Sequence, residues 1–256
     1  LLLSACGRDA PPYPFGDNDR DEKSIQGADA AARRSPYAFH AIKGWRSYPV
    51  AIQVDDSFDE LQQSQIISAV ETINTAAEAE LLQLVNADLE TQDSLDAYEK
   101  DSTFGLYNTQ DWSKTGKDSQ VIGTTLWEHD RERYIITGDV LLNTHCYIIS
   151  DATQTFKQST EVVDMHSLLL HELGHFLGLA HVDDEAEPNS VMRASLPIGR
   201  EVTQREYSEN DIRRLRYLAT QDGRWLEEIE WETPPSITIG ADDDREDRPP
   251  LPWKGC

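Results

Sequence analysis

Basic residues are scarce in this chain. Its 256 residues include 23 Lys and Arg against 47 Asp and Glu, which gives a formal net charge of −24 at pH 7. Proteins that bind nucleic acids neutralise phosphates with Lys and Arg, so this balance argues against a nucleic-acid partner. Long apolar runs are missing too, because no stretch approaches the roughly 20 apolar residues of a membrane-spanning helix. The acidic excess is instead expected to favour solubility.

Cysteine is rare as well, and the first of three cysteines is Cys6. It follows Leu3-Ser4-Ala5, in which small residues come after an apolar run, as export signals require before a cleavage site. This segment resembles the lipobox of bacterial lipoproteins, in which the signal is cut before the cysteine and that cysteine is lipidated. The resemblance implies an exported lipoprotein of the cell envelope, anchored to a membrane through Cys6. Gly7 then favours the outer membrane; the alternative is a stray cysteine in a disordered leader.

The other two cysteines are Cys146 and Cys256, an even pair once Cys6 is set aside. An exported protein lies in a compartment that permits disulfides, so a bond between them would attach the C-terminal tail to the folded domain. Two free thiols are the alternative, because sequence does not show whether the side chains meet.

Composition divides the chain into four parts. Residues 1–6 are interpreted as the remnant of a lipoprotein signal, and residues 7–36 as a flexible tether, since they are rich in Pro, Gly, Asp and Arg. Residues 233–256 form a similar acidic, Pro-rich tail, which leaves residues 37–232 as the expected folded domain.

Two acidic runs, at residues 183–185 and 242–244, carry carboxylates that suit calcium. Simple solvated charge is the alternative for each run, because most charge runs lie exposed on a surface. Calcium is therefore one possible cofactor of this chain.

Residues 171–181 read His-Glu-Leu-Gly-His-Phe-Leu-Gly-Leu-Ala-His. On a helix, His171 and His175 project from one face and can reach one zinc ion. Glu172 is then placed to take a proton from a water at the open metal position. Gly178 permits the turn that brings His181 back as a third ligand. The alternative, ordinary core and surface histidines, requires five fixed positions to coincide by chance.

The surrounding sequence supports a helix at this motif. Asp164 is a suitable N-cap, and the apolar residues between it and Gly178 are dense enough for a buried element. The full pattern resembles the metzincin metallopeptidases. That resemblance implies one catalytic zinc held by His171, His175 and His181, with Glu172 as general base and Met192 in a turn beneath the metal.

The predicted fold is α/β (α+β), a mixed twisted sheet with a long helix and an active-site helix. Strands are predicted at residues 48–54, 103–107, 120–128 and 133–143, the last two as a hairpin. A long helix should follow residues 55–57, and its apolar stripe comprises Ile66, Val70, Ile73, Ala77, Leu81 and Leu84. By the resemblance, residues 121–126 are the edge strand that binds the substrate backbone; a plain structural strand is the alternative.

A small C-terminal subdomain should contain the methionine turn and a final helix. Ser208 and Asp211 form a capping-box-like start, and the Ser-Glu-Asn-Asp-Ile sequence resembles the matrixin branch of the metzincins and its bacterial relatives. Residues 193–195 depart from that branch, which usually has tyrosine and proline after the methionine. No cysteine-switch propeptide is recognisable, and His129, His145 and His166 lack the neighbours of a second zinc site.

The sequence therefore predicts a zinc endopeptidase that hydrolyses peptide bonds of a protein or peptide substrate. A binding lipoprotein that keeps the zinc-peptidase fold without cleaving is one rival, and the intact Glu172 argues against it. A hydrolase acting on a non-peptide amide or ester is another, because the metal acts on any carbonyl.

Overall fold

The structure is a computed structural model. It describes residues 2–4, 43–87, 89, 92–100, 103–153, 162–182, 187–197 and 204–219. The predictions for the lipidated Cys6, the tether 7–36, the tail 233–256 and the acidic runs 183–185 and 242–244 lie outside these residues and stay predictions. Among the helices that the structure describes, none combines the length and apolar character needed to span a bilayer.

A five-stranded sheet forms one layer of the domain, in the order β3-β2-β4-β6-β5. Its strands are β2 (Val50–Asp55), β3 (Leu82–Ala87), β4 (Phe104–Thr109), β5 (Gly123–His129) and β6 (Ile135–Asn143). Four strands are parallel, and β5 pairs with β6 in antiparallel register at the edge. The predicted mixed α/β fold and the hairpin are confirmed.

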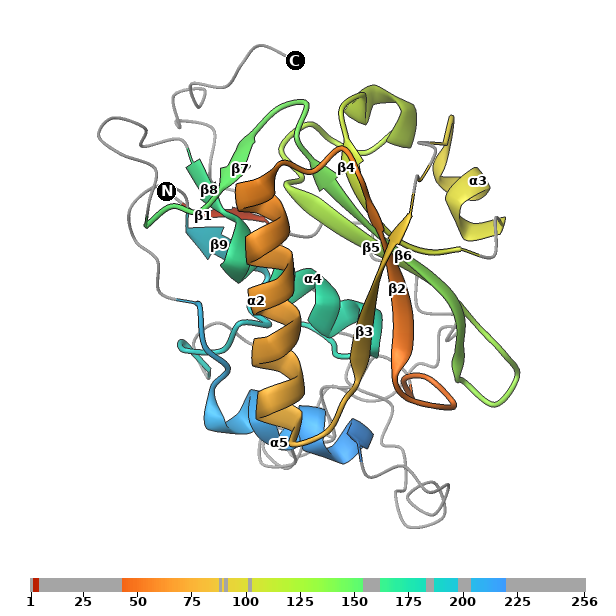
Figure 1. Cartoon of the computed structure of the whole chain (residues 1–256), viewed down its shortest axis with the longest axis vertical. Coiled ribbons are helices and arrows are strands. Elements are labelled where there is room, and N and C mark those ends of the chain that lie inside the picture. Colours follow the sequence, from red (N-terminus) through yellow and green to blue (C-terminus); the bar gives the residue numbers. More distant parts are fainter. Residues whose placement is uncertain are drawn as a thin grey trace, which may run out of the picture.

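Two helices lie together against the sheet: α2 (Glu60–Ala77) and α4 (Met165–Leu177) contact each other, and α4 also contacts β5 and β6 (Figure 1). A third helix, α5 (Glu209–Ala219), lies across the C-terminal end of α2, where Arg216 bonds the Ala76 carbonyl. The remaining elements are α3 (Leu95–Lys100), a 3-10 turn (Trp112–Thr115), the pair β1 (Leu2–Ser4) with β9 (Ser195–Pro197), and the pair β7 (Ile148–Ser150) with β8 (Val162–Asp164).

The long helix ends earlier than its apolar stripe predicts. Ile66, Val70, Ile73 and Ala77 are buried on α2, but Leu81 and Leu84 lie beyond its end. Glu78 adopts a left-handed conformation with φ 55°, and the Asn74 side chain accepts the amide of Leu81 at 2.8 Å. These contacts turn the chain into β3, so the prediction of a helix through Leu84 is wrong.

The helix follows residues 55–57 as predicted, and its N-cap is Asp59. The Asp59 carboxylate accepts the amide of Gln62 at 2.8 Å, and the Gln62 side chain accepts the amide of Asp59 at 3.1 Å. This reciprocal capping box fixes where α2 starts.

Trp45 anchors the segment before β2 to the sheet and to α4. Its indole N–H donates to the Phe176 carbonyl at 2.7 Å, and its ring packs against the rings of Phe104 and Phe176 at centroid distances of 4.8 and 5.0 Å. The core between the sheet and α4 is therefore closed by aromatic contacts as well as by aliphatic side chains.

Cys146 is buried and disulfide-bonded. The alternative of a free thiol at this position is therefore wrong. The other two cysteines, Cys6 and Cys256, lie outside the described residues, so the pairing with Cys256 stays a prediction.

Candidate metal centre

Helix α4 is buried over nearly its whole length and carries the first half of the histidine motif. Asp164 caps its N-terminus as predicted, because one carboxylate oxygen accepts the backbone amide of Ser167 at 3.0 Å and the hydroxyl of Ser167 at 2.7 Å. Burial of its leucines fixes the rotation of the helix, which turns His171 and Glu172 into the protein interior.

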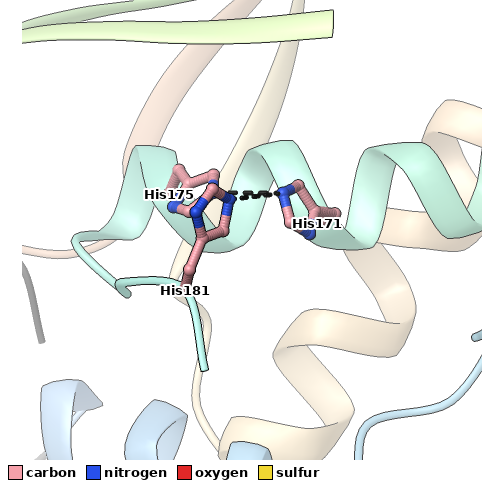
Figure 2. A group of neighbouring side chains, drawn as sticks. All are labelled: His171, His175 and His181. Carbon is pink, nitrogen blue, oxygen red and sulfur yellow. Dashed lines mark hydrogen bonds between the residues drawn. The ribbon is translucent and has the colours of Figure 1, made fainter. Parts of the chain in front are cut away.

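Gly178 ends α4 in a left-handed conformation with φ 109°, which side chains other than glycine rarely adopt. The amide of Leu179 donates to the Gly174 carbonyl at 2.9 Å and closes the turn. The chain then reverses, and His181 faces the two histidines of the helix (Figure 2).

The three-His group (His171, His175 and His181) brings its ligand atoms within 4.8 Å of one another. The Nε2 atom of His171 lies 3.1 Å from that of His175 and 3.3 Å from that of His181 (Figure 2). A tetrahedral zinc ion bound at about 2.0–2.1 Å separates its ligand nitrogens by about 3.3 Å, so these spacings fit zinc.

The protonation state of the three histidine rings also fits a bound metal ion. The Nδ1 atoms of His171 and His175 lie 2.7 Å from the carbonyls of Val191 and Leu179, and a carbonyl only accepts, so each Nδ1 carries the proton. Burial, with a neighbouring histidine as the second cause, lowers the pKa of each ring in the three-His group to about 3. His171 and His175 are therefore neutral with the proton on Nδ1, and their Nε2 lone pairs point at each other, an arrangement that calls for a cation between them.

Glu172 lies between α4 and the edge strand β5 and is fully buried. The hydroxyl of Thr125 lies 2.8 Å from its Oε2 atom and 2.9 Å from its main-chain oxygen. A Cβ atom on Gly123 would stand 2.9 Å from Oε1, so any other residue at this position would require the Glu172 carboxylate to shift. Sequence reasoning singled out neither Thr125 nor Gly123 as individual residues, because nothing in the strand marks which of its residues meets the helix.

The Met-turn (residues 189–192) lies directly beneath the helix. Met192 is fully buried, and a Cβ atom on Gly174 would stand 2.5 Å from its sulfur. The Val191 carbonyl accepts the His171 Nδ1 proton, and the Met192 carbonyl accepts the amide of Val182 at 3.0 Å. The Met-turn therefore contacts His171 directly, and it contacts Val182, the residue that follows His181.

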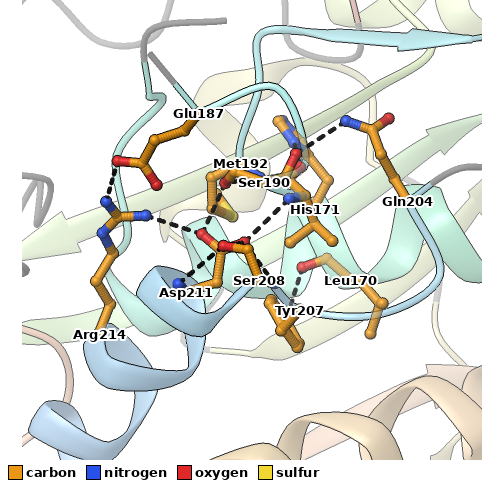
Figure 3. A network of polar contacts seen from close by, with 11 residues as sticks. Leu170, His171, Glu187, Ser190, Met192, Gln204, Tyr207, Ser208, Asp211 and Arg214 are labelled. Atoms are coloured by element: carbon orange, nitrogen blue, oxygen red, sulfur yellow. Dashed lines mark hydrogen bonds and ion pairs between the residues drawn. The ribbon is translucent and has the colours of Figure 1, made fainter.

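Asp211, on the first turn of α5, supports the Met-turn from below (Figure 3). Its carboxylate accepts the Ser190 hydroxyl at 2.7 Å and the Val191 amide at 3.1 Å, besides the Ser208 hydroxyl at 2.8 Å. The predicted capping contact with Ser208 is confirmed, and the contact with the Met-turn was not anticipated.

The other singled-out histidines lie apart from this group. His129 contacts the Asp130 carbonyl at 2.8 Å, and His145 contacts the Gln110 carbonyl at 2.7 Å. Burial, followed by the nearby Arg205, lowers the pKa of His166. Within the described residues, the three-His group is the one cluster whose ligand atoms converge as a metal site requires.

Comparison with known proteins agrees with this geometry. The family model of the matrixins, a family of zinc-dependent metallopeptidases, matches residues 88–219, which is half of the chain. The matched region contains the edge strand, α4, the Met-turn and α5. No curated protein matches the sequence. On this match and on the geometry of the three-His group, the chain belongs to the matrixin family of metallopeptidases.

Proposed function

We propose that this protein is a zinc endopeptidase in which His171, His175 and His181 hold the metal and Glu172 is the general base. The observation that carries the proposal is the convergence of three neutral imidazoles beside a fully buried carboxylate. Zinc bound there supplies a Lewis acid that polarises a carbonyl and acidifies water. Glu172 takes the proton released by the attacking water and passes it to the leaving amine.

The edge strand supports a peptide as the substrate. Strand β5 is at the edge of the described sheet, where it pairs with β6 alone. Its Thr125 contacts Glu172 of α4. An extended peptide added to this edge would be held by main-chain hydrogen bonds, with its scissile carbonyl near the three-His group. Binding along a strand, rather than at a chain terminus, favours cleavage inside the substrate.

Digestion of a mixed peptide library by the full chain tests the proposal, with and without a zinc chelator. We expect internal cleavages that disappear with the chelator and return with added zinc. A parallel digest of small amide and ester substrates addresses the rival hydrolase. An absence of peptide products from chain that binds one zinc would favour the non-catalytic binding lipoprotein.

Loss of the Thr125 hydroxyl is expected to weaken catalysis without weakening metal binding. Thr125→Val keeps the shape of this buried side chain but removes the hydrogen bond that orients Glu172. A hydrogen bond to a charged group contributes about 1.5–3 kcal/mol, so we expect kcat/KM to fall by about 10- to 100-fold. Thr125→Ser should retain most activity because it keeps the hydroxyl. Equal kcat/KM in the valine variant and the unmodified chain would contradict the orienting role.

We also propose that the protein is exported and anchored through a lipid on Cys6. The disulfide at Cys146 supports export, since disulfides persist in oxidising compartments. A bond between Cys146 and Cys6 would occupy the thiol that lipidation needs, so the anchor requires Cys146 to pair with Cys256. Peptide mapping without reductant distinguishes the two pairings, and a Cys6–Cys146 peptide would exclude the anchor.

A further inference from the structure

Arg214 on α5 is a buried cation whose partners include the carboxylates of Asp211 and Glu187. Its side chain is 1% exposed, its Nη1 atom lies 2.9 Å from Asp211 Oδ1, and its Nη2 atom lies 2.5 Å from Glu187 Oε1 (Figure 3). Arg213 on the same helix is instead 62% exposed. Because a buried charge is unfavourable unless it is paired, these carboxylates help to hold Arg214 in one position.

The partners of Arg214 come from two different parts of the metal centre. Asp211 bonds the Ser190 hydroxyl and the Val191 amide, so it fixes the Met-turn from the side of α5. Glu187 belongs to the connection between His181 and that turn, and its side chain is 10% exposed. The guanidinium therefore joins the connection after the third histidine to the helix that supports the turn.

From the Met-turn, the contacts continue to the histidines. The Val191 carbonyl accepts the His171 Nδ1 proton at 2.7 Å, which keeps the Nε2 lone pair directed at the other rings. The Met192 carbonyl accepts the amide of Val182, the residue after His181, at 3.0 Å. A shift of Asp211 or of Glu187 would therefore be passed through the Met-turn to His171 and to the residue that follows His181.

We propose that Arg214 is a positioning residue that presets the three-His group for zinc by fixing Asp211 and Glu187 together. The inference rests on the proposed function, because it assumes zinc in that group. Arg214 does not touch the metal site itself and acts through the Met-turn. Sequence reasoning had no signal for it, since an arginine on a polar helix is ordinarily exposed.

The experiment compares zinc affinity in Arg214→Met, Glu187→Ala and Arg213→Met with the unmodified full chain, by competition with a chromophoric chelator. Residues that orient metal ligands typically contribute 10–100-fold to affinity, so we expect Arg214→Met to raise the zinc Kd by about that factor. Glu187→Ala should raise the zinc Kd by a smaller factor, because Asp211 still pairs with Arg214 in that variant. Arg213→Met, a matched change on the exposed side of the same helix, should leave it unchanged.

A second readout separates positioning from stability alone. Each variant is melted with and without zinc, because a structural loss lowers both melting temperatures together, whereas loss of positioning narrows the gap between them. An unchanged zinc Kd and an unchanged gap in folded Arg214→Met would overturn the inference. If Arg214→Met does not fold, an unchanged zinc Kd and an unchanged gap in Glu187→Ala would overturn the inference. Failure of the unmodified chain to bind zinc would overturn the proposed function as well, which distinguishes the two failures.

Discussion

Replacing Glu172 with glutamine is expected to lower kcat by about 10²–10⁴-fold while one zinc ion per chain stays bound. The amide keeps the shape of the side chain and still accepts the Thr125 hydroxyl, so the packing between α4 and β5 should persist. It cannot take a proton from water at neutral pH, however, and the proposed base is lost. Because the histidines are unchanged, the effect should appear in turnover and not in metal content.

Initial rates on a peptide chosen from the library, together with zinc content per chain, measure this effect. Glu71→Gln is the matched control, since Glu71 is exposed on α2 and the substitution removes one charge that does not belong to the three-His group. Near-normal turnover in zinc-loaded Glu172→Gln would assign the base to another group. Loss of zinc along with activity would instead mean that Glu172 helps to hold the metal.

Removal of zinc is expected to abolish turnover and to lower the melting temperature markedly. A ligand present at about 1,000 times its Kd stabilises the folded state by about 4 kcal/mol, which chelation would withdraw. Differential scanning calorimetry with chelator, followed by zinc repletion, measures the loss and its reversal. A melting temperature that does not respond to either treatment would contradict a zinc ion bound within the three-His group.

The zinc-free protein should also become less stable as the pH falls from 7 to 5. The pKa of each ring in the three-His group is about 3 in the folded chain and about 6.5 when unfolded. Between these values the unfolded state binds more protons, so stability decreases as pH falls through 6.5 and levels off below about 3. His166 contributes in the same direction, because burial lowers its pKa as well.

Thermal melts of the zinc-free chain at several pH values between 5 and 7 test this linkage, above the range in which ordinary carboxyls titrate. His181→Gln is the matched variant, since it removes one of the titrating rings and should flatten the dependence. A steeper slope in that variant, or no slope in the unmodified zinc-free chain, would mean that these rings are not held neutral.

Short-range patterns predicted much of the fold. Residues 48–54 and 133–143 match β2 and β6 closely, and Ser208 with Asp211 marked the start of α5, because strand alternation and helix caps depend on neighbouring residues. Strand β3 was missed, since its leucines continue the apolar spacing of α2. What ended the helix was the Asn74 side chain, which bonds the chain seven residues later.

The sequence by itself determined the class of chemistry. The spacing of His171, Glu172 and His175 places them on one stretch of helix, and Gly178 permits the reversal that returns His181, so eleven consecutive residues contain the candidate metal ligands and base. These relations are local, and any chain that folds this segment as a helix and turn brings the same groups together.

Only the tertiary structure decided how those groups are held. Thr125 orients Glu172 from 47 residues away, and Asp211 supports the Met-turn across 20 residues, while Arg214 reaches Glu187 across 27. Each contact joins separate elements whose approach depends on packing of the whole core. The histidine motif thus predicts a zinc site, whereas its rigidity comes from burial and hydrogen bonds that no local pattern encodes.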